Sequence, residues 1–311
     1  MADLLSTLSS AEPAASPERR RTVAENTDHR YVLTLNGPER PGLLHAITGF
    51  LVGYQADIRE LKQFDDALSE SYVARVDFAL PSESDPGLEP LQASVDELSR
   101  RWHLECRLRR STTKTRVLVM VSKFEHCLND LLFRTRIGEL PIEIVAIGSN
   151  HTDHQDIAEW YRVPFHHVPI TRDTKPQAEA ELLRLLAEYD VELLVLARYM
   201  QILSDDLITR LPVPAINIHH SFLPSFKGAR PYHQAYERGV KTVGATAHYV
   251  TSDLDEGPII SQQVQEVDHA YRPDDLVAAG RDTECKALSN AVRWHSEGRV
   301  VTQGRRTIVL R

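Results

Sequence analysis

Four polar side chains that could take part in catalysis, three of them titratable, fall within one short segment, residues 215–262. Asn217 and His219 end an apolar run that is typical of a buried strand. Residues two positions apart project to the same face of an extended chain, so these two side chains point to the same side. His248 lies in a second strand pattern, and Asp255 lies in a turn that contains glycine and proline.

This set of side chains suits attack on a carbonyl carbon through a tetrahedral intermediate. The Asn217 amide can donate a hydrogen bond to a developing oxyanion. The His219 imidazole can exchange protons, and Asp255 can orient an imidazole or take a proton from water. From the residues alone, a structural hydrogen-bond network remains the alternative, because these residue types are common at strand ends.

Neither covalent catalysis nor a metal site is predicted. Ser221 and Ser225 stand in no Gly-x-Ser-x-Gly elbow, and Cys127 has no obvious partner. Several of the 14 histidines form close pairs, but none comes with thiolates or with a His-Glu-x-x-His motif. Satisfied or surface histidines are therefore the preferred interpretation.

The composition is that of an ordinary globular protein. Of the 311 residues, 42% are hydrophobic and 26% are charged, and this length is typical of two domains. The net charge of −8 argues against a nucleic-acid-binding face. No apolar run is long enough to cross a membrane. The three cysteines, odd in number and far apart, predict a reduced, cytoplasmic protein.

The elements that must position the polar side chains alternate over residues 115–311. Strand patterns that are apolar through their length alternate with helices, which is typical of a mostly parallel sheet covered on both faces. A long amphipathic helix over 273–296 and a strand over 306–310 close the chain. In such α/β sheets the ligand lies beyond the carboxyl ends of the strands, where Asn217 and His219 fall. We therefore expect a Rossmann-like α/β domain.

Residues 29–110 predict a smaller unit with a different order of elements. Strand and helix patterns follow one another as β-α-β-β-α-β, which is the ferredoxin-like unit. Residues 1–28 are dominated by Ala, Ser, Pro and Glu without strong periodicity, and they predict a disordered arm. A polar linker over residues 111–114 joins the two folded units.

The order of this first unit and its turn sequence PERPGLL resemble the ACT domain, a small regulatory module. The resemblance implies that a small amino-acid effector binds near Arg40, Gly42 and Leu43. Gly42 would let the backbone approach such a ligand closely. ACT domains pair through their sheets, so a homo-oligomer is expected. The alternative is a dimerisation module that binds no ligand.

The sequences NIHHSFLPSFKGARPYHQAYERGV and GATAHYVTSDLDEGPII resemble the catalytic core of the folate-dependent formyltransferase superfamily. That superfamily has an Asn-x-His pair and an Asp in an Asp-x-Gly turn. The resemblance therefore implies that Asn217, His219 and Asp255 are the catalytic residues. The segment LARYMQIL and the segment after the second strand pattern are implied to form the folate pocket. Its implied residues are Arg198, Met200, Ile202, Leu203, Val250 and Asp253.

Three features favour hydrolysis over formyl transfer within this superfamily. Members that act on glycinamide ribonucleotide hold a phosphate on a glycine-rich loop, whereas the matching residues 122–129 contain no glycine. The catalytic motif reads His219-His220-Ser221, where the transferases usually have proline in the middle. An ACT-like domain precedes the catalytic unit. Together these features resemble members that hydrolyse 10-formyltetrahydrofolate to tetrahydrofolate and formate.

The resemblance implies that the formyl oxygen faces Asn217 and His219, that water replaces the amine acceptor, and that Asp255 assists proton transfer. His220 and His248 are expected to position the water or to be structural. The folate is the substrate, and no cofactor is implied. The formate would supply purine synthesis, and the reaction would balance the one-carbon folate pool. Two alternatives stay open: a formyltransferase with an amine acceptor, and a non-catalytic amino-acid sensor.

Overall fold

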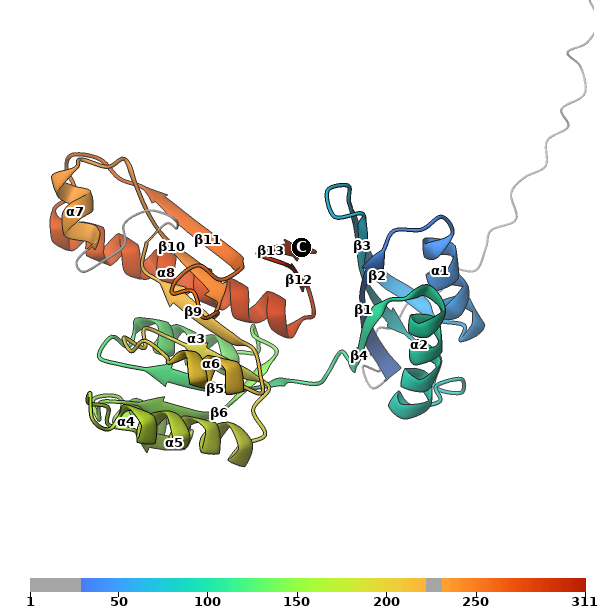
Figure 1. The fold of residues 1–311 in the computed structure, drawn as a ribbon, viewed down its shortest axis with the longest axis horizontal. Helices are drawn as coiled ribbons and strands as arrows, with labels where there is room; N and C mark the ends of the chain where they lie inside the picture. The colour runs from blue at the N-terminus through green and yellow to red at the C-terminus, as the bar shows by residue number, and fades with distance from the viewer. Residues whose placement is uncertain (1–28, 222–230) are drawn as a thin grey trace, which may run out of the picture.

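The computed structural model describes residues 29–221 and 231–311. Two folded units are visible in it, and a short hairpin stands between them (Figure 1). The arm predicted over residues 1–28 lies outside the described residues.

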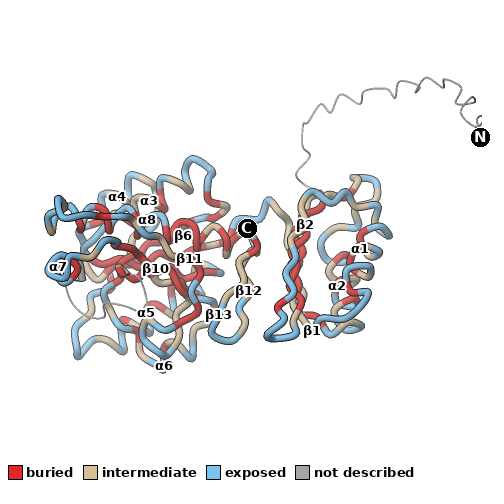
Figure 2. The backbone as a smooth tube through the Cα atoms, turned by 90° about the horizontal axis from the view of Figure 1, so that it is seen from above, coloured by how far each residue is buried: buried red, intermediate tan, exposed pale blue. Residues whose placement is uncertain are grey.

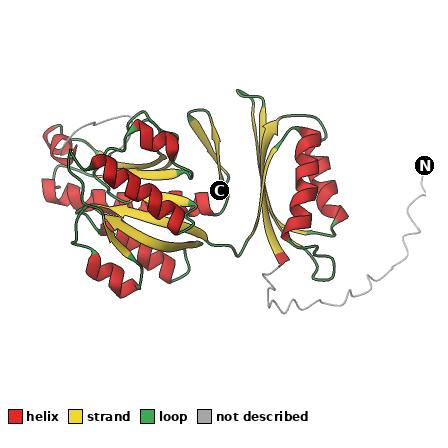
Figure 3. Ribbon diagram, turned by 60° about the horizontal axis from the view of Figure 1, so that its bottom comes forward, coloured by secondary structure: helices red, strands yellow, loops and turns green. Residues whose placement is uncertain are grey.

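The N-terminal unit is a four-stranded antiparallel sheet with two helices on one face (Figure 3). Its elements are β1 (Arg30–Pro38), α1 (Leu43–Gly53), β2 (Asp57–Asp66), β3 (Ser71–Ala79), α2 (Leu88–Trp102) and β4 (Glu105–Arg110). The strands lie in the order β2-β3-β1-β4. Apolar side chains of β1, β3 and both helices meet in one core, because each element turns its apolar face inward. The elements follow the predicted β-α-β-β-α-β order.

The second unit is built on a seven-stranded sheet. Its elements are β5 (Thr115–Val121), α3 (His126–Arg136), β6 (Ile142–Ser149), α4 (Gln155–Tyr161), β7 (Phe165–His167), α5 (Lys175–Glu188), β8 (Leu193–Leu196), α6 (Asp205–Arg210), β9 (Ala215–His219), α7 (Pro231–Glu237), β10 (Thr242–Tyr249), β11 (Ile259–Glu266) and α8 (Pro273–Ser296). The strand order is β11-β10-β9-β8-β5-β6-β7.

The predicted mostly parallel α/β sheet is confirmed. Strands β5 to β9 run parallel to their neighbours, whereas β10 and β11 are antiparallel. Every residue of β8 is buried, and buried positions follow the central strands in Figure 2. Layers on both faces explain why these strands are apolar throughout and show no alternation. The closing helix α8 packs against β9, β10, β11 and α3.

The chain ends in a hairpin that the sequence only half predicts. Strand β13 (Arg306–Val309) matches the predicted terminal strand, but it pairs with β12 (Val300–Gln303), which the sequence patterns did not indicate. Strand β12 has four residues, too few for a readable period. Gly304 adopts a φ of 58° in the turn between the strands, a left-handed conformation that glycine adopts without strain.

The N-terminal sheet and the end of α8 are joined by hydrogen bonds to three consecutive carbonyls. Thr34 Oγ1 donates to the carbonyl of Gly298 at 2.8 Å, and Arg75 Nε donates to that of Glu297 at 2.9 Å. Arg109 Nη1 donates to the carbonyl of Ser296. The last carbonyls of a helix lack partners within the helix, so side chains from three strands of the other unit cap α8.

No helix among the described residues is both long enough and apolar enough to span a membrane.

Candidate active site

The predicted catalytic residues meet at the centre of the seven-stranded sheet. Asn217 and His219 are two residues apart at the C-terminal end of β9, so their side chains project from the same face of the sheet. The antiparallel partner β10 sets His248 opposite Asn217, and the parallel partner β8 sets Leu196 opposite Asn217. Pairing of three strands therefore fixes where these side chains stand.

Asp255 reaches this cluster from the loop between β10 and β11. Its Oδ2 lies 3.2 Å from His219 Nδ1, and its Oδ1 lies 3.7 Å from His248 Nε2. The hydrogen bond from His219, together with the nearby His248, holds the pKa of Asp255 well below its usual range, although burial acts in the opposite direction. Asp255 is therefore an ionised carboxylate that faces two imidazoles.

The Asp-x-Gly turn owes its shape to Gly257. A Cβ atom at Gly257 would stand 1.8 Å from the carbonyl oxygen of Tyr249, so only glycine fits against the end of β10. Asp255 itself has a φ of 57°, which is uncommon for a residue with a side chain. The tight turn and this backbone conformation bring the carboxylate back over the sheet. The signature is thus a requirement of packing as well as of chemistry.

His248 is held so that it can position Asn217. Its Nδ1 lies 2.9 Å from the carbonyl oxygen of Tyr249, which can only accept, so Nδ1 carries the hydrogen. In the neutral ring Nε2 is then an acceptor, and the Asn217 Nδ2 lies 3.3 Å away. One hydrogen of the Asn217 amide is used in this contact. The second hydrogen remains for a substrate oxygen.

The Nε2 atom of His219 is buried and makes no hydrogen bond within the described part of the chain. Its Nδ1 hydrogen faces the ionised Asp255, which fixes the ring orientation. A buried polar atom without a partner is costly in a folded protein and is common where a substrate binds. The imidazole is therefore arranged to exchange a proton through Nε2, beside an amide donor for an oxyanion.

His220 is close to the same cluster but is set up as a neutral imidazole. Its ring centroid lies 5.2 Å from that of His219. Burial, then the charge of Arg198, and then His219 lower the pKa of His220 to about 4. A neutral ring can both donate and accept a hydrogen bond near neutral pH, as a group that positions water must.

The predicted folate residues lie on two loops that flank the triad. Met200 and Ile202 are 53% and 62% exposed, which is unusual for large apolar side chains and suits an apolar ring system as a ligand. Leu203 and Val250 both belong to one apolar cluster, Leu203 as a buried member and Val250 as a partly buried residue packed against it. Asp253 is exposed. The assignment of these residues to a folate stays a prediction.

Arg198 was also predicted to contact the folate, and its guanidinium lies inside the protein. The residue is only 9% exposed, and its Nε lies 3.4 Å from Glu284 Oε2. The sequence interpretation did not identify Glu284, which is 1% exposed on α8. The available signal was a carboxylate on the apolar stripe of an amphipathic helix, in register with Ala287, Leu288 and Ala291.

His126, Cys127 and Glu284 form the one group of potential metal ligands found among the described residues, with ligand atoms within 4.8 Å of one another. His126 Nε2 lies 2.7 Å from Glu284 Oε2, which is a hydrogen-bond distance. The cation of Arg198 already faces the same oxygen. Burial raises the pKa of the Cys127 thiol, which keeps it from acting as a thiolate ligand or nucleophile.

The turn predicted to bind an effector in the N-terminal unit contains a glycine in the left-handed backbone conformation. Gly42 has a φ of 88° at the start of α1. Leu43 is buried in the core, and Arg40 is exposed. These positions neither require nor identify a ligand, so the effector site stays a prediction.

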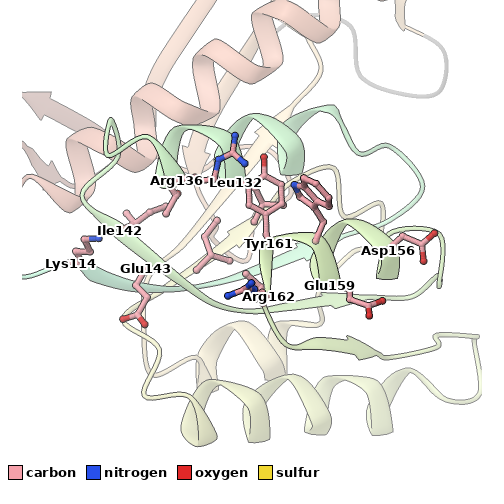
Figure 4. Close-up of a pocket in the computed structure, with 13 residues that line it drawn as sticks. Lys114, Leu132, Arg136, Ile142, Glu143, Asp156, Glu159, Tyr161 and Arg162 are labelled. Atoms are coloured by element: carbon pink, nitrogen blue, oxygen red, sulfur yellow. The ribbon is translucent and has the colours of Figure 1, made fainter.

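A separate pocket of about 930 Å³ lies between α3, β6 and α4 (Figure 4). It is lined by residues such as Leu132, Ile142 and Tyr161, and it includes none of the predicted catalytic or folate residues. The cluster around Asp255 therefore remains the candidate active site, because titratable groups with a perturbed pKa converge there on the predicted catalytic residues.

A family model described as Formyl transferase matches residues 115–292. A formyltetrahydrofolate deformylase of Corynebacterium sp. (strain P-1) is 62% identical over 282 residues, which is 91% of this chain and 98% of that protein. Among solved structures, a formyltetrahydrofolate deformylase from Burkholderia mallei has a TM-score of 0.86 at 48% identity and covers 91% of this chain and 100% of its own. A glycinamide ribonucleotide transformylase from Symbiobacterium toebii has a TM-score of 0.59 at 32% identity and covers 64% of this chain and 95% of its own.

Proposed function

Because this chain belongs to the formyl transferase family and, within it, to the formyltetrahydrofolate deformylases, we propose that Asn217, His219 and Asp255 carry out its reaction. The enzyme is a hydrolase that converts 10-formyltetrahydrofolate to tetrahydrofolate and formate. The observation that carries the residue assignment is the buried, unpartnered Nε2 of His219, backed on its other nitrogen by an ionised Asp255.

Water attacks the formyl carbon, and the free hydrogen of the Asn217 amide faces the oxygen that becomes the oxyanion. His219 Nε2 takes the proton of the water, because the lowered pKa of Asp255 makes that carboxylate a weak base. Asp255 holds the imidazole and stabilises its charged form. When the tetrahedral intermediate collapses, the carbon–nitrogen bond breaks and His219 returns the proton to the folate nitrogen. A positioned acid/base group supplies roughly 10²–10⁴ in rate.

The folate would bind beside this triad, against the two loops that carry the predicted folate residues. The exposed Met200 and Ile202 would cover the apolar face of the pterin, and Leu203 and Val250 would form its floor. Asp253 would accept hydrogen bonds from the pterin edge. His220 and His248 are neighbours that position the water and Asn217, as their contacts with His219 and Asn217 support.

The N-terminal unit would act as an ACT domain that binds an amino acid near Arg40, Gly42 and Leu43 and pairs copies of the chain into a homo-oligomer. The order of its elements supports this assignment. In a cytoplasmic enzyme the formate would supply purine synthesis. Hydrolysis rates measured with single amino acids added would test the effector, and a rate unchanged by all of them would refute it.

The test of the reaction is formate release from 10-formyltetrahydrofolate without any amine acceptor. We expect stoichiometric formate and tetrahydrofolate. A formyltransferase would release product only after an amine is supplied, so formate that appears only with an acceptor contradicts hydrolysis. A non-catalytic amino-acid sensor would produce none under either condition.

A further inference from the structure

Arg198 is a buried cation with unused hydrogen-bond donors at the edge of the active site. Its Nε and Nη1 atoms are both buried and make no hydrogen bond within the described part of the chain. Its backbone has a φ of 63°, an uncommon value for a residue with a side chain. Because buried donors without a partner are costly, such an arrangement is expected where a ligand completes the hydrogen bonds.

Neighbouring side chains fix the guanidinium in this position. Glu284 Oε2 lies 3.4 Å from Arg198 Nε, and His126 Nε2 lies 2.7 Å from the same oxygen. The ring of Phe124 lies 5.3 Å below the guanidinium carbon. Glu284 thus contacts His126 as well as Arg198, so Arg198 is held without sole use of this carboxyl group.

Arg198 follows the strand that lies beside the catalytic strand. Leu196, the last residue of β8, pairs with Asn217 of β9, and the two strands run parallel. Arg198 comes two residues after β8 ends. The charge of Arg198 also acts on His220, so the guanidinium and that ring are close in space.

Hydrolysis and formyl transfer differ in the charge of what leaves this site. Transfer to an amine produces a neutral amide. In hydrolysis water adds to the formyl carbon, the carbon–nitrogen bond breaks and the folate nitrogen takes a proton, while the formyl group leaves as formate and a proton. A carboxylate is therefore produced within the site only in the hydrolytic reaction.

We propose that Arg198, held by Glu284 and His126, is a carboxylate-binding group of the active site and that its ligand is the formate product. This inference rests on the proposed function. The planar guanidinium can bind a carboxylate in a fork through its two terminal nitrogens, and the buried Nη1 makes no hydrogen bond among the described residues, while Nε faces Glu284. The same chemistry could come from a glutamate carboxylate of the folate tail. The two sources give different results in the experiment below.

The experiment measures formate binding and substrate use in three variants of the full chain. Arg198→Met removes the charge, Arg198→Lys keeps the charge but loses the fork, and Arg210→Met is a control at an exposed arginine paired with Asp206. Binding is followed by line broadening of ¹³C-formate in NMR spectra, without turnover. KM is measured with 10-formyltetrahydrofolate and with 10-formyltetrahydropteroate, which lacks the glutamate.

We expect formate binding to weaken at least about tenfold in Arg198→Met, less in Arg198→Lys and not at all in Arg210→Met. The KM ratio of the two substrates should stay constant. Unchanged formate binding together with a KM increase only for the glutamate-bearing substrate would overturn the formate assignment in favour of the tail. Unchanged binding and unchanged KM would overturn the carboxylate site altogether. If Arg198→Met does not fold, the Lys variant decides in the same way.

Failure of this inference can be told apart from failure of the proposed function. If the wild-type protein releases no formate from 10-formyltetrahydrofolate, the function itself is wrong. If it releases formate but Arg198 variants bind formate as tightly as the wild type, only the role of Arg198 is wrong.

Discussion

Two buried arginines, Arg75 in the N-terminal sheet and Arg198 beside the active site, show how this chain separates structure from chemistry. Arg75 is 3% exposed, and each of its guanidinium nitrogens faces an acceptor. Its Nη1 lies 2.7 Å from Glu60, its Nη2 lies 3.7 Å from Asp77, and its Nε donates to the carbonyl of Glu297. Among the described residues, Arg198 has two buried nitrogens without a hydrogen bond. A buried cation whose nitrogens all face acceptors stabilises a junction, whereas one with buried donors that make no hydrogen bond suits a ligand.

The same contrast holds for the histidines of the two regions. His295, near the end of α8, has its Nδ1 in a hydrogen bond with Tyr249 Oη at 2.7 Å. Within the described part of the chain, His219 Nε2 makes no hydrogen bond. We therefore expect substitutions near the junction to lower stability and substitutions in the site to lower turnover. A substitution in one region that changes the property expected of the other would contradict this separation.

The largest effect is expected from Asp255→Asn. The amide cannot stabilise a charged His219, so kcat should fall by at least about 10²-fold. The melting temperature should remain near that of the wild type, since the substitution keeps the size of the side chain. His219→Ala should cost a similar factor. Steady-state hydrolysis and thermal melts measure both quantities, and equilibrium binding of a non-formylated folate should be largely unchanged.

A neighbouring carboxylate supplies the control for this prediction. Glu256 is next in the chain, is exposed and pairs with Arg305 at 3.1 Å. Glu256→Gln should leave kcat within about twofold, as surface changes usually do. Near-normal turnover in purified Asp255→Asn, or an equal loss in Glu256→Gln, would remove the basis for the catalytic assignment.

The converse effect is expected from Arg75→Met. Loss of the guanidinium removes charge-assisted hydrogen bonds to Glu60 and to the carbonyl of Glu297, and it should lower the free energy of unfolding by about 2 kcal/mol. Asp77 keeps its contact with Arg30, which limits the loss. The kcat of the folded enzyme should not change. Denaturant titration and hydrolysis assays measure the two quantities.

Arg59→Met is the matched control, because Arg59 is a more exposed arginine 3.3 Å from Asp57 on the same sheet. It should change stability by less than about 0.5 kcal/mol. A large loss of kcat in Arg75→Met without a loss of stability would show that the junction acts on the reaction, and the division between the two regions would fail.

The sequence indicates the catalytic strand well because its signals are local. Two residues of one strand, Asn217 and His219, share a face by the period of the pleat, and Gly257 marks the turn that returns Asp255. Glu284 was missed because its role depends on where α8 crosses the sheet, which no local period specifies. Its only signal was a charge on an apolar stripe.

The contacts between the two units also could not be predicted from the sequence. The three carbonyls that end α8 are backbone atoms, and a sequence carries no information about which side chains reach them. Strand β12 was too short to recognise, although its partner β13 was predicted. Long periodic elements such as α8 were readable to their bounds, because packing and propensity agree there.

A smaller effect is expected on acidification. His220 and His295, one in each region, have pKa values lowered to about 4, in both cases mainly by burial. Between about pH 6.5 and pH 4 the unfolded chain binds protons that the folded chain does not, so stability falls as pH falls. Each histidine should contribute roughly 1 kcal/mol of this loss between pH 7 and pH 5.5.

Substitution separates the two histidines. His295→Gln should reduce the pH dependence of the free energy of unfolding by about half without changing kcat at pH 7. His220→Gln should reduce it similarly and also lower kcat. Denaturant titrations at the two pH values measure the slopes. Equal kcat in both variants would mean that His220 belongs with the structural histidine rather than with the site.

The smallest effect is expected from Thr34→Val. The hydroxyl of Thr34 donates to the carbonyl of Gly298, the third of the carbonyls that join α8 to the N-terminal sheet. Valine has nearly the same shape, so the change removes one neutral hydrogen bond and should cost about 1 kcal/mol of stability. Glu284 on α8 contacts Arg198, so the junction could in principle affect the active site. If the junction and the site are independent, Thr34→Val leaves kcat and formate binding unchanged. A shift in formate binding without a change in the melting temperature would instead show that the N-terminal sheet acts through α8 on Arg198.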